Sequence, residues 1–373
     1  MSALHIDIAP LRNGCYIAIT ASRSRRRHCP RATTHAAKFI HARRCRATRV
    51  FLPLVPFPHP SPGSTMDLAT LPDCRAGTAP HAAAVADDNT DLNNTAFLTA
   101  VRRATTSLRA AGVSTGDVVA IMLPNTAALV VSLFATWRLG ATATLIDPAS
   151  PTEDACHRMA YTGAEVLIAV RQRADAFPVR TVIPVDTLTT APPDTHGPAR
   201  ARDDAPALLI HTNHAGGDPE IVTLDHLNLN ALCRLAIEIF ALTDTDHSLS
   251  ILPLFHLNGI AVGTVSPLLA GGRTTVVGPF SPTTFFDRIE GSRATYFTAD
   301  PTMYTQLSDL PAEIQPNTTS VRLAICGAAR AGDELRTKFE HRYGIPIIQD
   351  HGLTEVPGRA RFIRPIGPLN RSC

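Results

Sequence analysis

A loop with a hydroxyl and a carboxylate side chain follows an apolar run near the C-terminal end of the chain. The run is Ile345–Ile348, and after it come His351, Gly352, Thr354 and Glu355. In α/β sheets, ligands bind just beyond the carboxyl ends of the strands, which is where this loop is expected. Glycine lets a ligand approach the backbone, threonine can donate to a phosphate oxygen, and glutamate can bind a divalent metal ion. The pattern is a candidate phosphate and metal site, and the alternative is an ordinary polar loop that closes a strand.

A second candidate loop contains two adjacent glycines. Gly216 and Gly217 follow an apolar run over 207–210, and Thr212 lies between the run and the glycines. A turn of this kind can present backbone N–H groups to a phosphate. The G-x-x-x-x-G-K-[ST] spacing of a Walker A loop is not present, and a plain glycine turn is the alternative.

A serine flanked by glycines is excluded as a nucleophile by its position. Residues 112–116 read Gly-Val-Ser-Thr-Gly and so match the G-x-S-x-G pattern. A nucleophile elbow requires a strand before that serine and a helix after it. Here a predicted helix precedes the motif and a predicted strand follows it, so we do not expect a serine hydrolase.

Strands and helices alternate along most of the chain. Apolar residues at helical spacing predict helices that include 97–111, 227–240 and 333–343, and Asn125 is predicted to cap the helix that contains Trp137. The predicted strands are 118–123, 141–146, 165–170, 181–185, 207–210, 248–252, 273–277, 294–298, 321–326 and 345–348. This alternation predicts an α/β fold in which helices cover mostly parallel sheets.

The chain, at 373 residues with 45% hydrophobic residues, is too long for one compact unit. We expect a first α/β subdomain over 66–185 and an exposed linker over 186–206. A second α/β subdomain over 207–355 would carry the candidate site, and 356–373 would form an irregular tail.

The first 65 residues differ from the rest in charge. They contain 11 Lys and Arg and one acidic residue, whereas the whole chain has a net charge of +3, so the remainder is acidic. An arginine-rich arm of this kind can bind nucleic acid or act as a transit peptide. The lack of a hydrophobic period and the many prolines instead favour a disordered extension, and Met66 is an alternative start. We expect no nucleic-acid partner.

The sequence has no apolar run of the ~18 residues that a membrane helix requires, so we expect a soluble, cytoplasmic protein without a transmembrane segment. Its eight cysteines have no CxxC spacing, which favours a reducing compartment. Cys29, His35, His41 and Cys45 have the residue types of a zinc site, but their segment has no predicted fold that would hold the ligands in place.

Several segments follow one another in a recognisable order. They are LPLFHLNG at 252–259, ATYFTADPTMY at 294–304, CGAA at 326–329, HGLTE at 351–355, and an earlier GDV, LPN, RLGA and DP series within 116–148. In this order the segments resemble the motifs of the adenylate-forming superfamily, which includes acyl-CoA synthetases, luciferases and non-ribosomal peptide adenylation domains. The resemblance covers about residues 75 to 355 and implies the large N-terminal domain of such an enzyme.

The resemblance implies a two-step reaction that uses ATP, Mg²⁺ and coenzyme A. A carboxylate, expected to be that of a fatty acid, attacks the α-phosphate of ATP and releases pyrophosphate. A thiol, usually that of coenzyme A, then takes the acyl group. The implied partners are therefore small molecules: a carboxylic acid, ATP and coenzyme A.

The resemblance also assigns roles to residues. It implies that Thr354 contacts the α-phosphate, that Glu355 binds Mg²⁺, and that His256 lines the entrance for the acyl substrate. The residues implied to bind the nucleotide are Thr212, Gly216, Gly217, Gly327, Ala328, Ala329, His351 and Gly352. For His256 the alternative is an ordinary histidine that precedes a buried helix.

Two departures from the family pattern weaken the expectation of catalysis. Where the family's phosphate loop has a lysine, this chain has Glu220, and a carboxylate close to a triphosphate repels it. The resemblance fades after Glu355, so the C-terminal domain and its adenylating lysine are not expected in this chain. The alternative is an impaired pseudoenzyme that binds a nucleotide or acyl ligand, with a protein partner that supplies or replaces the C-terminal domain.

Overall fold

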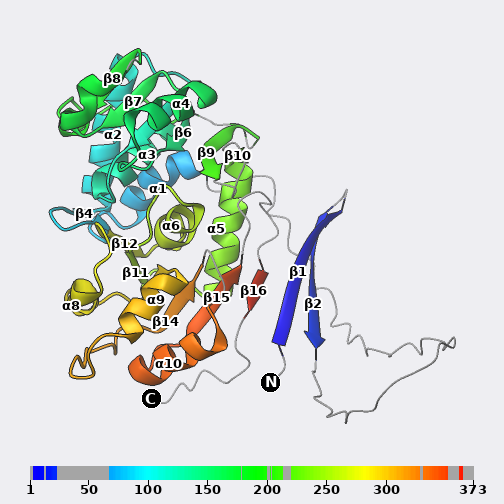
Figure 1. Ribbon diagram of the computed structural model, residues 1–373. Helices are drawn as coiled ribbons and strands as arrows, with labels where there is room; N and C mark the ends of the chain where they lie inside the picture. The colour runs from blue at the N-terminus through cyan, green and yellow to red at the C-terminus, as the bar shows by residue number, and fades with distance from the viewer. Residues whose placement is uncertain are drawn as a thin grey trace, which may run out of the picture.

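The structure is a computed structural model that describes residues 3–11, 14–22, 67–177, 179–199, 202, 204–212, 220–327, 331–351 and 361–363. Within these residues the main body consists of two β-sheets with helices packed against them (Figure 1). The α/β fold predicted from the sequence is confirmed.

The first sheet contains six strands. In spatial order they are β10 (Glu220–Asp225), β9 (Pro206–Thr212), β6 (Thr142–Leu145), β5 (Val118–Met122), β7 (Val166–Ala169) and β8 (Thr181–Pro184). All neighbours are parallel except β10, which pairs with β9 in the antiparallel sense. The central strands are rich in valine, isoleucine and alanine because both faces of a parallel sheet are buried.

The second sheet contains eight strands. In spatial order they are β16 (Arg361–Ile363), β15 (Ile347–His351), β14 (Leu323–Cys326), β13 (Tyr296–Ala299), β11 (His247–Ser250), β12 (Arg273–Val276), β3 (Ala83–Ala86) and β4 (Asp91–Asn93). Only the outermost pairs at the two ends, β16 with β15 and β4 with β3, are antiparallel. The early strands β3 and β4 belong to this sheet and the later β9 and β10 to the first, so the chain crosses between the sheets.

The helices follow the strands that they cover. They are α1 (Leu71–Thr78), α2 (Asn94–Ala110), α3 (Ala127–Arg138), α4 (Thr152–Thr162), α5 (His226–Phe240), α6 (Leu257–Ile260), α7 (Ser266–Leu269), α8 (Pro282–Ser292), α9 (Pro301–Ser308) and α10 (Asp333–Tyr343). A π-helical turn, η4 (Ala261–Val265), joins α6 to α7, and short 3₁₀ turns form η1 (Leu68–Thr70), η2 (Arg171–Ala176) and η3 (Val185–Thr187). The helices predicted over 97–111, 227–240 and 333–343 are confirmed within a few residues.

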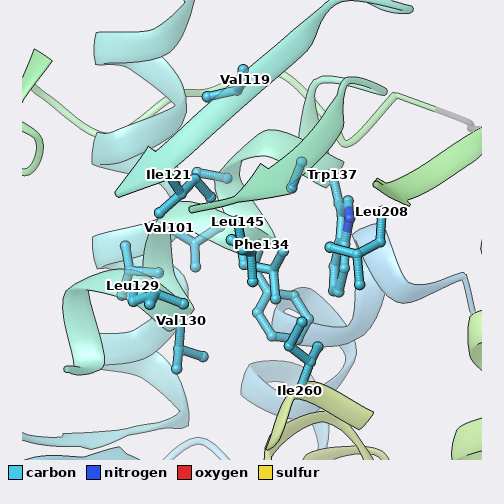
Figure 2. Packing of buried hydrophobic residues seen from close by; sticks show 14 of the residues in the cluster. Val101, Val119, Ile121, Leu129, Val130, Phe134, Trp137, Leu145, Leu208 and Ile260 are labelled. Atoms are coloured by element: carbon cyan, nitrogen blue, oxygen red, sulfur yellow. The ribbon is translucent and has the colours of Figure 1, made fainter. Parts of the chain in front are cut away.

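One hydrophobic core joins the two sheets. Phe134 on α3 makes edge-to-face contacts with Phe97 and Trp137, with ring centroids 5.4 and 5.1 Å apart. The same core includes Leu208 of the first sheet and Ile260 of α6, which follows a strand of the second sheet (Figure 2). The Trp137 indole N–H donates to the Ala207 carbonyl at 2.8 Å, which satisfies its polar group inside this core.

A buried arginine ties the first helix to the second sheet. The guanidinium of Arg75 donates to the carbonyl oxygens of Leu268 and Gly272, the latter at 2.7 Å, and to the Asn94 side chain at 2.7 Å. Burial lowers the pKa of Arg75 to about 10, so this side chain stays charged at neutral pH. The cation lies beside carbonyls at the end of α7, where the helix dipole is favourable for positive charge.

The segment predicted as an exposed linker is held against α2. The Asp194 N–H donates to the Arg102 carbonyl at 3.0 Å, and the Ser107 hydroxyl donates to the Leu188 carbonyl at 2.8 Å. Most described residues of 186–206 are exposed or half-buried, as expected for a connection, whereas Leu188 and Asp194 are buried. Proline and aspartate content did not reveal these contacts because their partners lie about 80 residues earlier in the chain.

Near the N-terminus, β1 (Ala3–Leu11) and β2 (Gly14–Ser22) form an antiparallel hairpin. The sequence predicts a disordered extension over 1–65, so the hairpin is a difference from that expectation. Residues 23–66 lie outside the described residues.

The glycine-flanked serine lies where the sequence predicts, after α2 and before β5. Gly112 and Gly116 have φ of 84° and 90°, and the Ser114 hydroxyl donates to the Asp117 carboxylate at 3.0 Å. The serine therefore belongs to a turn between a helix and a strand, which is not a nucleophile elbow.

Candidate functional site

The carboxyl edges of the two sheets come together at one place. Asn125 follows β5 in the first sheet, and its side-chain amide bonds to the main chain of Leu252 and Leu254, which follow β11 in the second sheet. Parallel α/β sheets bind ligands at such edges. The residues that emerge here from both sheets form the candidate site.

His256 lies at this junction, in the loop between β11 and α6. Its side chain is exposed, and its ring packs against that of Phe255 with centroids 4.6 Å apart. Partial desolvation lowers the pKa of His256 below its usual range, while the carboxylates of Asp147 and Asp300 oppose that shift. A neutral imidazole can donate one hydrogen bond and accept another, which suits it to orient a carboxylic acid.

The two carboxylates near His256 come from different sheets. Asp147 follows β6 in the first sheet, where the Ala149 N–H donates to it at 2.8 Å. Asp300 follows β13 in the second sheet and caps α9 by accepting from the Met303 N–H at 2.8 Å. Each carboxylate is therefore held in place by a backbone N–H donor.

Gly327 lies at the same edge, directly after β14. Its N–H donates to the Ala299 carbonyl at 3.1 Å, and a Cβ added to it would lie 2.3 Å from Nδ2 of Asn258. Asn258 is two residues beyond His256, so the start of α6 packs directly against the turn that the sequence assigns to adenine. The space that a side chain at 327 would need is filled by the Asn258 amide.

The double-glycine loop lies between two antiparallel strands. Thr212 ends β9 and Glu220 begins β10, and the two residues are cross-strand partners. The loop itself, with Gly216 and Gly217, lies outside the described residues. The strand β10 was not predicted from the sequence, and its pairing places Glu220 at the base of this loop.

His211, next to Thr212, has a neutral imidazole. Its Nε2 lies 3.3 Å from the hydroxyl of Thr144 on β6. Desolvation, with a smaller contribution from the Arg158 cation, lowers the pKa of His211 to about 4. The side chain at the base of the glycine loop is therefore uncharged at neutral pH and able to exchange a hydrogen bond with Thr144.

The remaining predicted site residues belong to β15 and to the segments after β14 and β15. His351 ends β15 at the correct sheet edge, but its side chain is not described, and Gly352, Thr354, Glu355, Ala328 and Ala329 lie outside the described residues. Across the ranges that the structure describes, no group of three or more His, Cys, Asp or Glu side chains could hold a metal ion. The assignment of Mg²⁺ to Glu355 stays a prediction.

Among the helices of the described residues, none has the length and apolar character of a membrane-spanning segment.

The sequence did not identify Asn125, Asp147, Asp300 or Asn258 as site residues. Asn125, Asp147 and Asp300 each come within three residues after the end of a buried strand. A polar residue at such a position is a signal that could have been used. Asn125 was instead predicted to cap α3. The structure shows Thr126 at the cap position, and the Asn125 amide bonds to the opposite sheet.

The fold and this edge define a class of protein. Two helix-covered sheets, mostly parallel, present a neutral histidine, carboxylates and a close-packed glycine turn at their joined carboxyl ends. This is the architecture of the large domain of an adenylate-forming enzyme, as the sequence motifs imply.

Comparison with known proteins agrees with that class. The family profile described as "AMP-binding enzyme" matches residues 73–371. The chain therefore belongs to the AMP-binding enzyme family, and the family resemblance read from the motifs is confirmed.

The relatives in this family are CoA ligases. Feruloyl-CoA synthase of Amycolatopsis sp is 30% identical over 311 residues, which cover 80% of this chain and 63% of that protein. Oxalate–CoA ligase of Arabidopsis thaliana is 29% identical over 269 residues, covering 66% of this chain and 52% of that protein. The chain thus spans less than two thirds of the length of these relatives.

Solved structures show the same fold at low sequence identity. ATP-bound MatB from Rhodopseudomonas palustris superimposes with a TM-score of 0.72 at 20% identity, covering 81% of this chain and 63% of that one. The N-terminal domain of FACL13 from Mycobacterium tuberculosis gives 0.72 at 20% identity and covers 79% and 77%. The match covers a larger share of the FACL13 N-terminal domain than of the MatB chain.

Proposed function

We propose that this chain binds ATP and a carboxylic acid at the joined sheet edges and forms an acyl-adenylate. A carboxylate oxygen attacks the α-phosphorus, the bond from that phosphorus to pyrophosphate breaks, and pyrophosphate leaves. A thiol such as that of coenzyme A then attacks the acyl carbon and releases AMP. The observation that supports the proposal is the position of His256, exposed at the edge where Asp147 and Asp300 also emerge.

The roles of the remaining site residues follow from that proposal. His256 orients the acid, and the turn that begins at Gly327 receives the adenine. Thr354 contacts the α-phosphate and Glu355 holds Mg²⁺, as the motif at 351–355 implies. Mg²⁺, when bound, would offset phosphate charge during the attack.

The acid is the least constrained part of the proposal. The sequence prediction is a fatty acid, and one relative is a medium/long-chain-fatty-acid–CoA ligase, whereas others are named for feruloyl, oxalate and sulfoacetate substrates. A panel that contains a fatty acid, an aromatic acid and a small dicarboxylic acid separates these classes.

The experiment is acid-dependent exchange of labelled pyrophosphate into ATP with Mg²⁺ present, with ATP binding measured by calorimetry. We expect ATP binding, and exchange with at least one acid class. The absence of both ATP binding and pyrophosphate exchange, with every acid of the panel, would refute the proposed function.

A second candidate is a nucleotide- and acyl-binding protein without turnover. Glu220, which stands where the family has a lysine, favours it, because its cross-strand pairing with Thr212 keeps residue 220 at the base of the glycine loop. A carboxylate here weakens triphosphate binding, and reversal of its charge strengthens binding.

The variant Glu220→Lys, assayed with and without the C-terminal domain of a relative added in trans, separates the two candidates. If Glu220→Lys with the added domain recovers an exchange that the wild-type chain lacks, an impaired enzyme is favoured. If the wild-type chain binds ATP and no combination supports exchange, the binder is favoured. Glu313→Lys makes the same charge change at an exposed glutamate between α9 and β14 and serves as the control.

A further inference from the structure

Asn125 makes a two-point contact between the sheets. Its Nδ2 donates to the Leu252 carbonyl at 2.8 Å, and its Oδ1 accepts from the Leu254 N–H at 3.0 Å. The side-chain amide thus pairs with the main chain of the other sheet as the backbone of a neighbouring strand would. Because one end donates and the other accepts, the two bonds fix the orientation of the amide.

The helix that follows does not need this side chain as a cap. At the start of α3, the Ala127 N–H donates to the carboxylate of Asp87 at 2.8 Å. Asp87 comes from the turn after β3 in the second sheet, so it satisfies a helix donor that Asn125 would otherwise serve. The Asn125 amide is therefore available for Leu252 and Leu254.

The segment that Asn125 holds leads directly to His256. The His256 N–H donates to the Pro253 carbonyl at 3.1 Å, which closes a turn on the residues paired with Asn125. From the other side, Gly259 approaches so closely that an added Cβ would lie 2.8 Å from the Pro253 oxygen and 3.2 Å from the Leu252 oxygen. The backbone before His256 is fixed between Asn125 and Gly259.

We propose that Asn125 is a positioning residue for His256: by pairing with Leu252 and Leu254 it holds the loop that carries the imidazole against the acid-binding edge. The part that concerns the acid rests on the proposed function, whereas the part that concerns the imidazole does not. No contact between Asn125 and the acid is implied.

Two variants test the proposal. Asn125→Ala removes both hydrogen bonds. Asn125→Asp keeps the size and the acceptor for Leu254 but places a carboxylate oxygen against the Leu252 carbonyl, so it keeps one bond and turns the other into a repulsion. It tests the same contact if the alanine variant folds poorly.

The matched control is Asn94→Ala. Asn94 is also a buried bridging asparagine: its Nδ2 donates to the Ala79 carbonyl at 2.7 Å, and its Oδ1 accepts from Arg75 at 2.7 Å. Removal of the Asn94 side chain lowers the stability of the fold, but Asn94 has no hydrogen bond to the loop before His256. A general loss of stability would therefore appear in both Asn94 and Asn125 variants.

The first readout is NMR of the histidine ring, with the His256 signals identified by their loss in His256→Gln. We expect these signals to shift in both Asn125 variants and the pKa of His256 to move closer to that of an ordinary histidine, because movement of the loop reduces the partial desolvation of the ring. The Asn94→Ala spectrum should match wild type at His256. Unchanged His256 signals and titration in folded Asn125 variants would overturn the proposal.

The second readout is binding of an acid that supports pyrophosphate exchange. We expect its dissociation constant to rise about tenfold in Asn125→Ala while that of ATP changes less than about twofold, since only the acid side of the edge is disturbed. Equal weakening of both ligands would contradict positioning of His256. If wild type binds no acid, the proposed function has failed, and the ring signals still decide the role of Asn125.

Discussion

Replacement of Gly327 by alanine should destabilise the protein through one identified contact. The added Cβ would lie 2.3 Å from Nδ2 and 3.1 Å from Cγ of Asn258. Ordinary contacts between such atoms are about 3.5 Å, so the amide has to withdraw by about 1 Å. Because a side-chain end and not backbone is displaced, we expect a cost of about 1–2 kcal/mol, in the lower part of the range for overpacked sites.

The measurement is a double-mutant cycle by urea unfolding, with wild type, Gly327→Ala, Asn258→Ala and the double variant. Without the Asn258 amide the new methyl group has room, so Gly327→Ala should cost about 1 kcal/mol less in the Asn258→Ala background. Gly77→Ala, in helix α1 with nothing within 4 Å of its added Cβ, should instead raise stability by about 0.5 kcal/mol.

Additivity of the two substitutions within about 0.3 kcal/mol would refute this reasoning. It would mean that the Asn258 amide does not occupy the space beside Gly327, and that α6 is not packed on the turn that follows β14. The loop that carries His256 and the turn at Gly327 would then not be in contact through Asn258.

Three further predictions concern the frame of the site. Burial, aided by the nearby Arg273 cation, lowers the pKa of His247 to about 4, below the unfolded value, so its contribution to stability is lost as pH falls from about 6.5 toward 4. The stability difference between wild type and His247→Gln should therefore shrink by about 2.5 kcal/mol between pH 7.5 and 4.5 in urea unfolding, and a difference independent of pH would contradict this. Arg75→Met leaves buried carbonyls without donors and should cost about 3 kcal/mol by the same assay; a loss below about 1 kcal/mol would show that water replaces the guanidinium. Gly259→Ala meets backbone oxygens that cannot rotate away, so it should cost about 2 kcal/mol or more and shift the His256 ring signals, whereas unshifted signals would separate Gly259 from that loop.

The sequence predicted the buried strands and the longer helices because their signals are local. Runs such as 118–123 and 321–326 are apolar without alternation, as strands buried on both faces are. Two of the strands that were missed have residue types that are uncommon in strands: β4 is Asp91–Asn93, with an exposed aspartate, and three of the four residues of β3 are alanine. Strand β10 was missed although its residues alternate, because the nearby glycines indicated a loop.

The site was predicted less completely than the fold. His256 and Gly327 were proposed from the order of motifs, and the structure places both after strands of the second sheet, at its carboxyl edge. Asn125 was assigned to a helix cap because sequence reasoning searches for partners within a few residues. Its actual partners lie 127 and 129 positions later, and only the fold brings them within hydrogen-bond distance.

The glycines of the motifs say less about ligand binding than the side chains between them. A larger residue at position 259 would clash with the Pro253 oxygen, and one at position 327 would clash with the Asn258 amide. The packing of the fold is therefore enough to explain both glycines. Neither requirement applies to His256, whose side chain is exposed, or to Glu220, since strand pairing with Thr212 uses only backbone groups. Substitutions at residues 256 and 220 therefore test the proposed function more directly than substitutions at these glycines.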